Sequence, residues 1–336
     1  MRFGSDPHGG DPAARHDFSV NVSPFGVCRA GRRALRAALR AAALYPDPLC
    51  ARLCAALAEK EGVPEGYVLA GNGAAELIYA CAARHAGGRA LVLGPTFGEY
   101  AAALRAFGGE AVIVFSEKEA LAALEGGGFS LFFVCIPNNP DGALLPRAAL
   151  FSLLEACVKQ GTRMVADACF FDFVRDAGYT LSELCAAGAT VVQSLTKSYA
   201  LAGVRVGYLL ASDAPALAPY LQPWNLSCFA LAAGEACARD RTYLKKMREL
   251  VERERAYLFG GLCALGYRPR ESYANFLLFP CAESVPAALR ARGFAVRVCA
   301  DFDGLCPEKG KTYVRICVKR RAENKKFLRA LAEVTE

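Results

Sequence analysis

The stretch that decides the fold is Ser194-Leu195-Thr196-Lys197-Ser198-Tyr199-Ala200-Leu201-Ala202-Gly203-Val204-Arg205-Val206-Gly207-Tyr208. It follows Thr190-Val191-Val192-Gln193, a short β-branched run of the kind that forms a buried strand. Lys197 therefore stands near the end of a buried strand, where an unpaired charge is costly. Desolvation lowers the pKa of a lysine and makes its amine a nucleophile toward aldehydes. Position and chemistry indicate a reactive amine.

Three neighbours of Lys197 are able to bind an anion. Ser194 and Thr196 carry hydroxyls, and Arg205 carries a fixed cation. Groups of this kind suit a phosphate monoester. An aldehyde for the amine and a phosphate for these side chains describe pyridoxal 5′-phosphate (PLP). The alternative interpretation is an ordinary exit from a strand with a solvated lysine.

The same stretch carries a family motif. Written as Ser-x-x-Lys-x-x-x-x-x-Gly-x-Arg-x-Gly-Tyr, it resembles the Schiff-base lysine motif of the fold type I, class I/II PLP-dependent aminotransferase family. The resemblance implies an α/β protein of PLP-dependent transferase fold type I. Such a protein has a large domain, with a mostly parallel sheet flanked by helices, and a smaller C-terminal α/β domain. We expect an N-terminal arm and helix over 1–45, the large PLP-binding domain over 46–240, and the interdomain helix with the small domain over 241–336.

Composition sets the broad class of protein. The chain has 336 residues, of which 54% are hydrophobic and 22% charged, as in a globular protein with room for a second, smaller domain. No apolar run reaches the length of a membrane span, and Met1–Asp6 has no signal-peptide core, so we expect a cytoplasmic protein without membrane contact. The net charge of +7 is scattered rather than gathered on one basic face, which disfavours nucleic acid as a partner.

Cysteine and histidine usage bears on metal binding. The fifteen cysteines form no C-x-x-C pair, and most lie singly in apolar runs, which predicts reduced and buried thiols. Only three histidines are present, so we expect no metal site.

Strand and helix patterns alternate along the middle of the chain. Predicted strands cover 90–94, 111–115, 130–135, 162–167, 190–194 and 206–211. This alternation favours a mostly parallel sheet with helices on both faces, and sites in such sheets gather at the carboxyl ends of the strands. An earlier helix is predicted at 27–43. The smaller region is predicted to contain strands at 274–279, 295–299 and 311–318 and helices at 284–292 and 322–333.

A second anion-binding feature precedes the lysine. Gly71-Asn72-Gly73-Ala74-Ala75-Glu76 opens an apolar helix that runs to about Arg84. Small residues at a helix start leave backbone N–H groups open to an anion, and the helix dipole favours negative charge there. We expect Gly73, Ala74 and Ala75 to form a phosphate cup, at the place where the family has its cofactor-phosphate loop.

Asp167 ends the apolar strand predicted at 162–167. A buried carboxylate needs a partner, and the protonated pyridine nitrogen of PLP is one; the carboxylate keeps that nitrogen charged and the ring an electron sink. Asp172, a few residues on, is interpreted as a possible surface acid. The family pattern here is Asp-Glu-Ala-Tyr. This chain has Ala168 for the glutamate, which is unexplained, and Phe170 for the tyrosine, which removes a hydrogen bond to the ring 3′-oxygen.

The resemblance assigns further cofactor contacts. Phe97 matches an aromatic that stacks on the pyridine ring, although plain packing in its turn is the alternative. Asn139, in Pro137-Asn138-Asn139-Pro140-Asp141-Gly142, matches an asparagine that hydrogen-bonds the ring 3′-oxygen. Tyr45 matches a tyrosine that reaches the cofactor phosphate of the neighbouring subunit, which implies a homodimer. Packing within its own turn is the alternative for Tyr45.

Two residues match the substrate side of the family's site. Arg315 lies in the apolar strand at 311–318 and matches the arginine that clamps a substrate carboxylate; an edge-strand salt bridge is the alternative. Asn21 lies in the segment 17–26, which resembles the N-terminal segment that crosses the active-site mouth in this family.

Four features resemble one branch of the family, the L-threonine-O-3-phosphate decarboxylases. They are His8-Gly9-Gly10, Phe170, Pro223-Trp224 and the run Arg297–Leu305. The branch implies decarboxylation of a small phosphorylated amino acid to aminopropanol phosphate, used for the aminopropanol arm of cobalamin, with His8 and Arg297 binding the substrate phosphate. Two alternatives stay open: an aminotransferase acting on histidinol phosphate, and a non-catalytic protein with the PLP fold.

Overall fold

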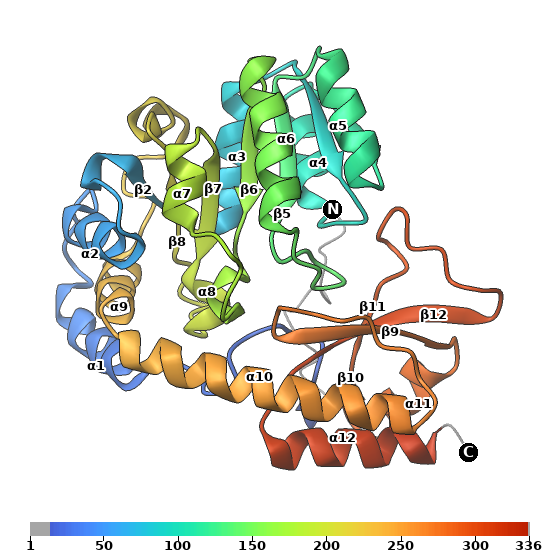
Figure 1. Cartoon of the computed structure of the whole chain (residues 1–336). Helices are drawn as coiled ribbons and strands as arrows, with labels where there is room; N and C mark the ends of the chain where they lie inside the picture. The colour runs from blue at the N-terminus through green and yellow to red at the C-terminus, as the bar shows by residue number, and fades with distance from the viewer. Residues whose placement is uncertain (1–13, 335–336) are drawn as a thin grey trace.

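A seven-stranded sheet forms the larger part of the molecule (Figure 1). The computed structural model describes residues 14–334. The strands of this sheet are β2 (Val68–Gly71), β3 (Arg89–Leu93), β4 (Glu110–Val114), β5 (Leu131–Cys135), β6 (Arg163–Asp167), β7 (Thr190–Ser194) and β8 (Gly207–Leu210). Their order is β2-β8-β7-β6-β5-β3-β4. Strands β3 to β7 pair in parallel, whereas β8 is antiparallel to both of its neighbours.

Helices cover both faces of this sheet (Figure 1). The α-helices are α1 (Arg29–Ala38), α2 (Ala51–Glu61), α3 (Ala74–Arg84), α4 (Glu99–Ala106), α5 (Glu117–Gly126), α6 (Arg147–Lys159), α7 (Leu181–Ala186), α8 (Leu195–Ser198), α9 (Cys228–Ala238), α10 (Arg241–Ala264), α11 (Val285–Ala291) and α12 (Arg321–Glu333). Along β5, Phe132 packs in the hydrophobic cluster that contains α2, α5 and α6, whereas Phe133 packs in the cluster that contains α3 and α4. Successive side chains of a strand point to opposite faces, so an unbroken apolar strand suits a sheet covered on both sides.

Short 3-10 turns connect several of these elements. They are η1 (Leu39–Ala41), η2 (Glu65–Tyr67), η3 (Phe171–Phe173), η4 (Ala214–Ala216) and η5 (Ala218–Tyr220). Among them, η3 follows the short loop after β6, so its residues lie close in the chain to the carboxyl end of that strand.

A smaller sheet lies toward the C-terminus. It contains β11 (Arg297–Val298), β12 (Lys311–Cys317) and β9 (Phe276–Ala282), in that order and all antiparallel. A separate two-stranded pair joins β1 (His16–Asp17) to β10 (Phe294–Ala295) in parallel. The N-terminal segment therefore packs on the C-terminal region before the chain enters the large sheet.

Helix α10 spans the two parts of the molecule (Figure 1). Its first turn is capped by Asp240, whose side chain accepts a hydrogen bond from the Tyr243 backbone nitrogen. Its later turns pack against α12 and β9. One continuous helix thus contacts η3 in the larger part of the molecule and β9 in the smaller sheet.

The structure confirms the mostly parallel α/β sheet, and each strand predicted for it lies within one residue of the observed one. The single strand predicted at 295–299 is wrong: β10 and β11 belong to two different sheets, because the chain turns between them. The helix predicted at 27–43 is shorter, since α1 ends at Ala38 and tightens into η1. The division into domains stays a prediction. Within residues 14–334, no helix combines the length and the apolar character that crossing a bilayer requires.

Candidate cofactor and substrate site

Three neighbouring parallel strands, β5, β6 and β7, deliver the predicted site residues to one edge of the large sheet. Asn139 follows β5, Asp167 ends β6 and Lys197 follows β7. The Asn138 side chain donates to the Pro95 carbonyl oxygen at 2.9 Å and so ties the loop after β5 to the loop after β3. The carboxyl ends of the strands thus converge on one place, as expected for a parallel sheet.

Lys197 lies on α8 and is partly buried. Ser194 caps this helix, its hydroxyl accepting from the Thr196 backbone nitrogen at 3.1 Å. Burial lowers the pKa of the Lys197 amine, and the Arg315 and Arg205 guanidinium groups lower it further. A lowered pKa favours the neutral amine, which is the nucleophilic form.

Asp167 is 5% exposed and is held on both of its oxygens. Oδ2 accepts from the Tyr100 hydroxyl at 2.6 Å, and Oδ1 accepts from the Cys169 backbone nitrogen at 3.0 Å. Burial, together with the Asp167 carboxylate, raises the pKa of Tyr100, so its hydroxyl keeps its proton and donates. Tyr100 was not predicted as a site residue. Its only signal was an aromatic in the first turn of a helix after β3, which does not distinguish it from a core residue.

Aromatic residues continue from Tyr100 along the site. Its ring stacks on Phe133, with the centroids 5.1 Å apart, and Phe97 meets it edge to face at 5.7 Å. Phe97 is partly exposed and stands after β3. Part of its ring is therefore accessible, and the stacking role that the resemblance implies stays a prediction.

The predicted phosphate cup has the chemistry of an anion site. Gly73 precedes α3 with φ of +82°, and no side chain caps the helix, which leaves the first backbone N–H groups of α3 without a cap. A Cβ on Gly73 would fall 2.5 Å from an Arg205 guanidinium nitrogen, so the glycine makes room for that cation. The Ser194 and Thr196 hydroxyl oxygens lie 2.7 Å from each other, at the start of the turn that carries Lys197. These residues fit a phosphate group.

Arg315 reaches the site from β12. It is 5% exposed, and its guanidinium donates to the Asn139 side-chain oxygen and to the Ser19 carbonyl oxygen, while Nε has no partner in the described part of the chain. Burial, with the neighbouring Arg297 cation, lowers the pKa of Arg315 to about 10. The edge-strand salt bridge is wrong for residues 14–334, because both partners found there are neutral oxygens. A buried guanidinium without a counterion is ready to bind an anion.

Arg297 lies directly opposite Arg315 in the β11–β12 pair. Its guanidinium donates to both carboxylate oxygens of Asp301, at 2.8 and 2.7 Å. Asn21 is buried in the N-terminal segment, and its side-chain oxygen lacks a hydrogen-bond partner among the described residues. Asn21 therefore has an acceptor available, whereas Arg297 already has an acidic partner.

The remaining predicted site residues are Phe170, Tyr45 and His8. Phe170 is buried and meets Phe276 edge to face at 5.0 Å; the Arg315 guanidinium lies 5.4 Å from the centre of that same Phe276 ring. Tyr45 is 85% exposed and touches Trp224, with the ring centroids 5.1 Å apart. His8 lies outside the described residues. Among residues 14–334, no three His, Cys, Asp or Glu side chains gather as a metal site would require.

The sheet order, with a lysine after β7 and an aspartate at the end of β6, is that of a fold type I PLP-dependent transferase. The chain belongs to the aminotransferase class I and II family, whose model matches residues 16–331. It is therefore a PLP-dependent enzyme, and the non-catalytic alternative is wrong.

Two curated relatives resemble the chain closely. It is 32% identical to the threonine-phosphate decarboxylase of Salmonella typhimurium, over 95% of this chain and 90% of that protein. It is also 32% identical to the histidinol-phosphate aminotransferase of Moorella thermoacetica, over 94% and 84%. Its fold matches the histidinol-phosphate aminotransferase of Sinorhizobium meliloti in complex with pyridoxal-5′-phosphate, with a TM-score of 0.85, 23% identity, and coverage of 96% and 90%.

Proposed function

We propose that this enzyme decarboxylates L-threonine O-3-phosphate to aminopropanol phosphate and carbon dioxide. The observation that carries the proposal is the register of β11 and β12, in which Arg297 and Arg315 are direct partners. Directly opposite residues of an antiparallel pair point to the same face of a sheet. Two guanidinium groups side by side suit a substrate with two anionic groups.

L-threonine O-3-phosphate carries both a carboxylate and a phosphate, whereas histidinol phosphate carries only a phosphate. Arg315, with its unpartnered Nε, is the group for the carboxylate. Arg297 is the group for the phosphate, provided that it turns from Asp301. His8 is proposed as a second phosphate ligand, and Asn21, with its free acceptor, as a partner for the substrate amine.

PLP, when bound, supplies an electron sink for the pair of electrons left on the substrate Cα. Gly73, Ala74 and Ala75 would hold its phosphate, with Ser194, Thr196 and Arg205. Asp167, kept in place by Tyr100, would face the pyridine nitrogen, with Asn139 at the 3′-oxygen and Phe97 on the ring.

Lys197 has two tasks in this scheme. Its neutral amine is the point of covalent attachment for the aldehyde, and the substrate amine takes that place. Lys197 would take up a proton from the substrate ammonium when the substrate amine replaces it. After the bond between Cα and the carboxylate breaks and carbon dioxide leaves, it would donate that proton to Cα. The lowered pKa of Lys197 suits both directions of proton transfer.

The second candidate is an aminotransferase acting on histidinol phosphate. The equal identity to the Moorella thermoacetica enzyme favours it, and so does the ion pair that already occupies Arg297. The same residues would then break the Cα–H bond instead of the bond to the carboxylate. Which bond breaks depends on which one is held perpendicular to the ring.

We also propose that the enzyme works as a homodimer. Tyr45 and Trp224 form an aromatic pair on the surface of this chain, and Tyr45 has little contact with its own subunit. Exposed aromatic pairs are typical of surfaces that meet a partner. In this arrangement Tyr45 serves the cofactor phosphate of the other subunit.

A paired product assay tests the proposed reaction. One sample of the PLP-loaded enzyme receives L-threonine O-3-phosphate alone, and carbon dioxide and aminopropanol phosphate are followed. The other receives histidinol phosphate with 2-oxoglutarate, and glutamate is followed. Carbon dioxide in the first sample only supports the decarboxylase; glutamate in the second only supports the alternative. The variant Lys197→Ala should be inactive in both, and undiminished turnover would contradict its role.

A further inference from the structure

The helical turn that carries Lys197 is too short to fix its own orientation. α8 spans four residues, and a single turn makes too few hydrogen bonds to offset the entropy of ordering it. Contacts from other elements must therefore hold it. The Ser23 backbone nitrogen donates to the Lys197 carbonyl oxygen at 2.8 Å, and the Ser198 hydroxyl donates to Asp172 Oδ2 at 2.7 Å.

Asp172 is 3% exposed, so its interpretation as a surface acid is wrong. Its Oδ1 accepts from Lys60 Nζ at 3.0 Å, and its backbone oxygen accepts from Arg248 Nε at 2.7 Å. Burial raises the pKa of the Asp172 carboxyl, but Lys60, Ser198 and Arg248 outweigh burial and lower it. The carboxylate thus stays charged and gives Ser198 a strong, charge-assisted hydrogen bond.

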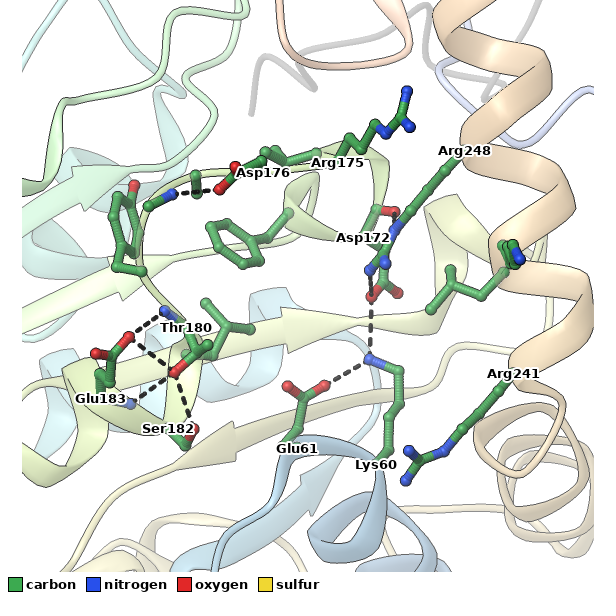
Figure 2. A pocket seen from close by; sticks show the side chains of 18 of the residues that line it. Lys60, Glu61, Asp172, Arg175, Asp176, Thr180, Ser182, Glu183, Arg241 and Arg248 are labelled. Atoms are coloured by element: carbon green, nitrogen blue, oxygen red, sulfur yellow. Dashed lines mark hydrogen bonds and ion pairs between the residues drawn. The ribbon is translucent and has the colours of Figure 1, made fainter.

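Lys60 is fixed in turn by its own partners. Figure 2 shows Lys60 pointing toward Glu61 and Asp172, with Arg248 approaching from α10. Lys60 Nζ also lies 3.1 Å from the Tyr208 hydroxyl on β8. The carboxylate that holds Ser198 is therefore anchored to α2 and α10, two elements that are independent of α8.

Asp172 also shares a short segment with Asp167, which lies five residues earlier at the end of β6. We propose that Asp172 is a positioning residue: by holding Ser198, it sets the orientation of Lys197 relative to Asp167. Asp172 touches neither cofactor nor substrate in this scheme and acts only through the turn. The inference rests on the proposed role of Lys197 as the PLP-binding lysine.

The test compares two variants of the full chain that each lose one hydroxyl from the same buried network. Ser198→Ala removes the bond to Asp172, whereas Tyr208→Phe removes bonds to Lys60 and Glu61 and leaves Ser198 in place. Each protein is stripped of PLP and reloaded, and the rate of covalent capture is followed by absorbance. Borohydride reduction and peptide mass then locate the modified lysine. Turnover of the reloaded enzyme gives kcat and KM.

We expect Ser198→Ala to slow capture at Lys197 and to lower kcat by roughly tenfold or more, with KM nearly unchanged, because displacing a reacting group by less than an ångström has effects of this size. Tyr208→Phe should stay within about twofold of the parent in both, because Lys60 keeps its ion pairs with Asp172 and Glu61 and so still anchors Asp172, although both variants unfold more easily. Asp172→Asn keeps an oxygen for Ser198 without the charge and should give an intermediate loss. It replaces Ser198→Ala if that variant does not fold.

Three outcomes would overturn the proposal: parental capture in Ser198→Ala, parental capture in Asp172→Asn, or an equal loss in Tyr208→Phe. Failure of the underlying assignment is distinguishable from these. If reduction locates the adduct on a lysine other than Lys197, or if Lys197→Ala captures PLP covalently at the parental rate, the role of Lys197 itself is wrong. Capture at Lys197 with no effect of Ser198→Ala refutes only the positioning role.

Discussion

Replacing Lys60 by methionine removes the lysine that contacts both Asp172 and Glu61. The side chains of all three are almost completely buried. Methionine fills similar volume but leaves two buried carboxylates without this cation. Removing one partner of a buried ion pair costs about 3–5 kcal/mol. We expect the lower end, about 3 kcal/mol, because Arg248 remains 4.0 Å from Asp172 and the Tyr208 hydroxyl still donates to Glu61.

The expected change in melting temperature follows from chain length. An unfolding entropy of about 2.1 cal/mol/K per residue gives roughly 0.7 kcal/mol/K for 336 residues. A loss of about 3 kcal/mol therefore lowers Tm by about 4 °C. Calorimetry of parent and variant at equal protein and PLP concentration measures this directly. Lys245→Met, which changes an exposed lysine of the pocket that Lys60 and Asp172 also line, is the matched control and should leave Tm unchanged.

The difference in stability between the parent and Lys60→Met should also depend on pH. In the parent the folded-state pKa of Asp172 is lowered, so its contribution to stability is present above the unfolded pKa, near 4, and is lost as the pH falls through the folded value. Without Lys60, burial dominates, and Asp172 costs stability as the pH rises. The gap between parent and Lys60→Met should therefore shrink from about pH 8 to about pH 5. A gap that grows toward acid, or a Tm equal to that of the parent, would refute the reasoning.

Three further changes test the site. Arg315→Lys keeps the positive charge but loses the planar guanidinium group. In a steady-state assay, kcat/KM for L-threonine O-3-phosphate should therefore fall roughly ten- to a hundredfold. An unchanged value would exclude Arg315 as the carboxylate ligand. Gly73→Ala places a Cβ 2.5 Å from the Arg205 guanidinium at a positive φ, so equilibrium dialysis should show PLP binding at least about tenfold weaker, and parental affinity would contradict the phosphate cup. Tyr100→Phe leaves Asp167 Oδ2 without its hydroxyl partner, so PLP should be lost faster on dialysis by roughly five- to tenfold, and equal retention would argue against a role for Tyr100.

The sequence predicted the large sheet well because its strands are apolar on both faces. The run Leu131–Cys135 and the run Thr190–Gln193 are too short and too apolar for surface helices, and each is followed by a polar turn. The carboxyl ends of parallel strands share one edge of a sheet, so the placement of Asp167 and Lys197 at that edge could be predicted with no knowledge of contacts. The two-residue strands β10 and β11 carry no such pattern, and their pairing depends on partners far along the chain.

The contacts that orient the site were not predictable in the same way. The pairs Tyr100–Asp167, Asp172–Ser198 and Asp172–Lys60 join residues 67, 26 and 112 positions apart. No local pattern distinguishes an aspartate that is buried by such partners from one on the surface, which is why Asp172 was misjudged. Sequence shows which chemical groups are present, but burial and partners depend on how distant elements pack.

The attachment of helix α10 to Asp172 affects how the two sheets can move relative to each other. Arg248 ties it to Asp172 about 24 Å before its end at Ala264, taking 1.5 Å per residue. A tilt of about 5° around that attachment would move the far end by roughly 2 Å, over the same helix length. This distance is enough to make or break the hydrogen bond by which Arg315, on the small sheet, reaches Asn139 on the large one. A small tilt of α10 would therefore change the contact between the two sheets while its attachment beside the lysine-bearing turn stays in place.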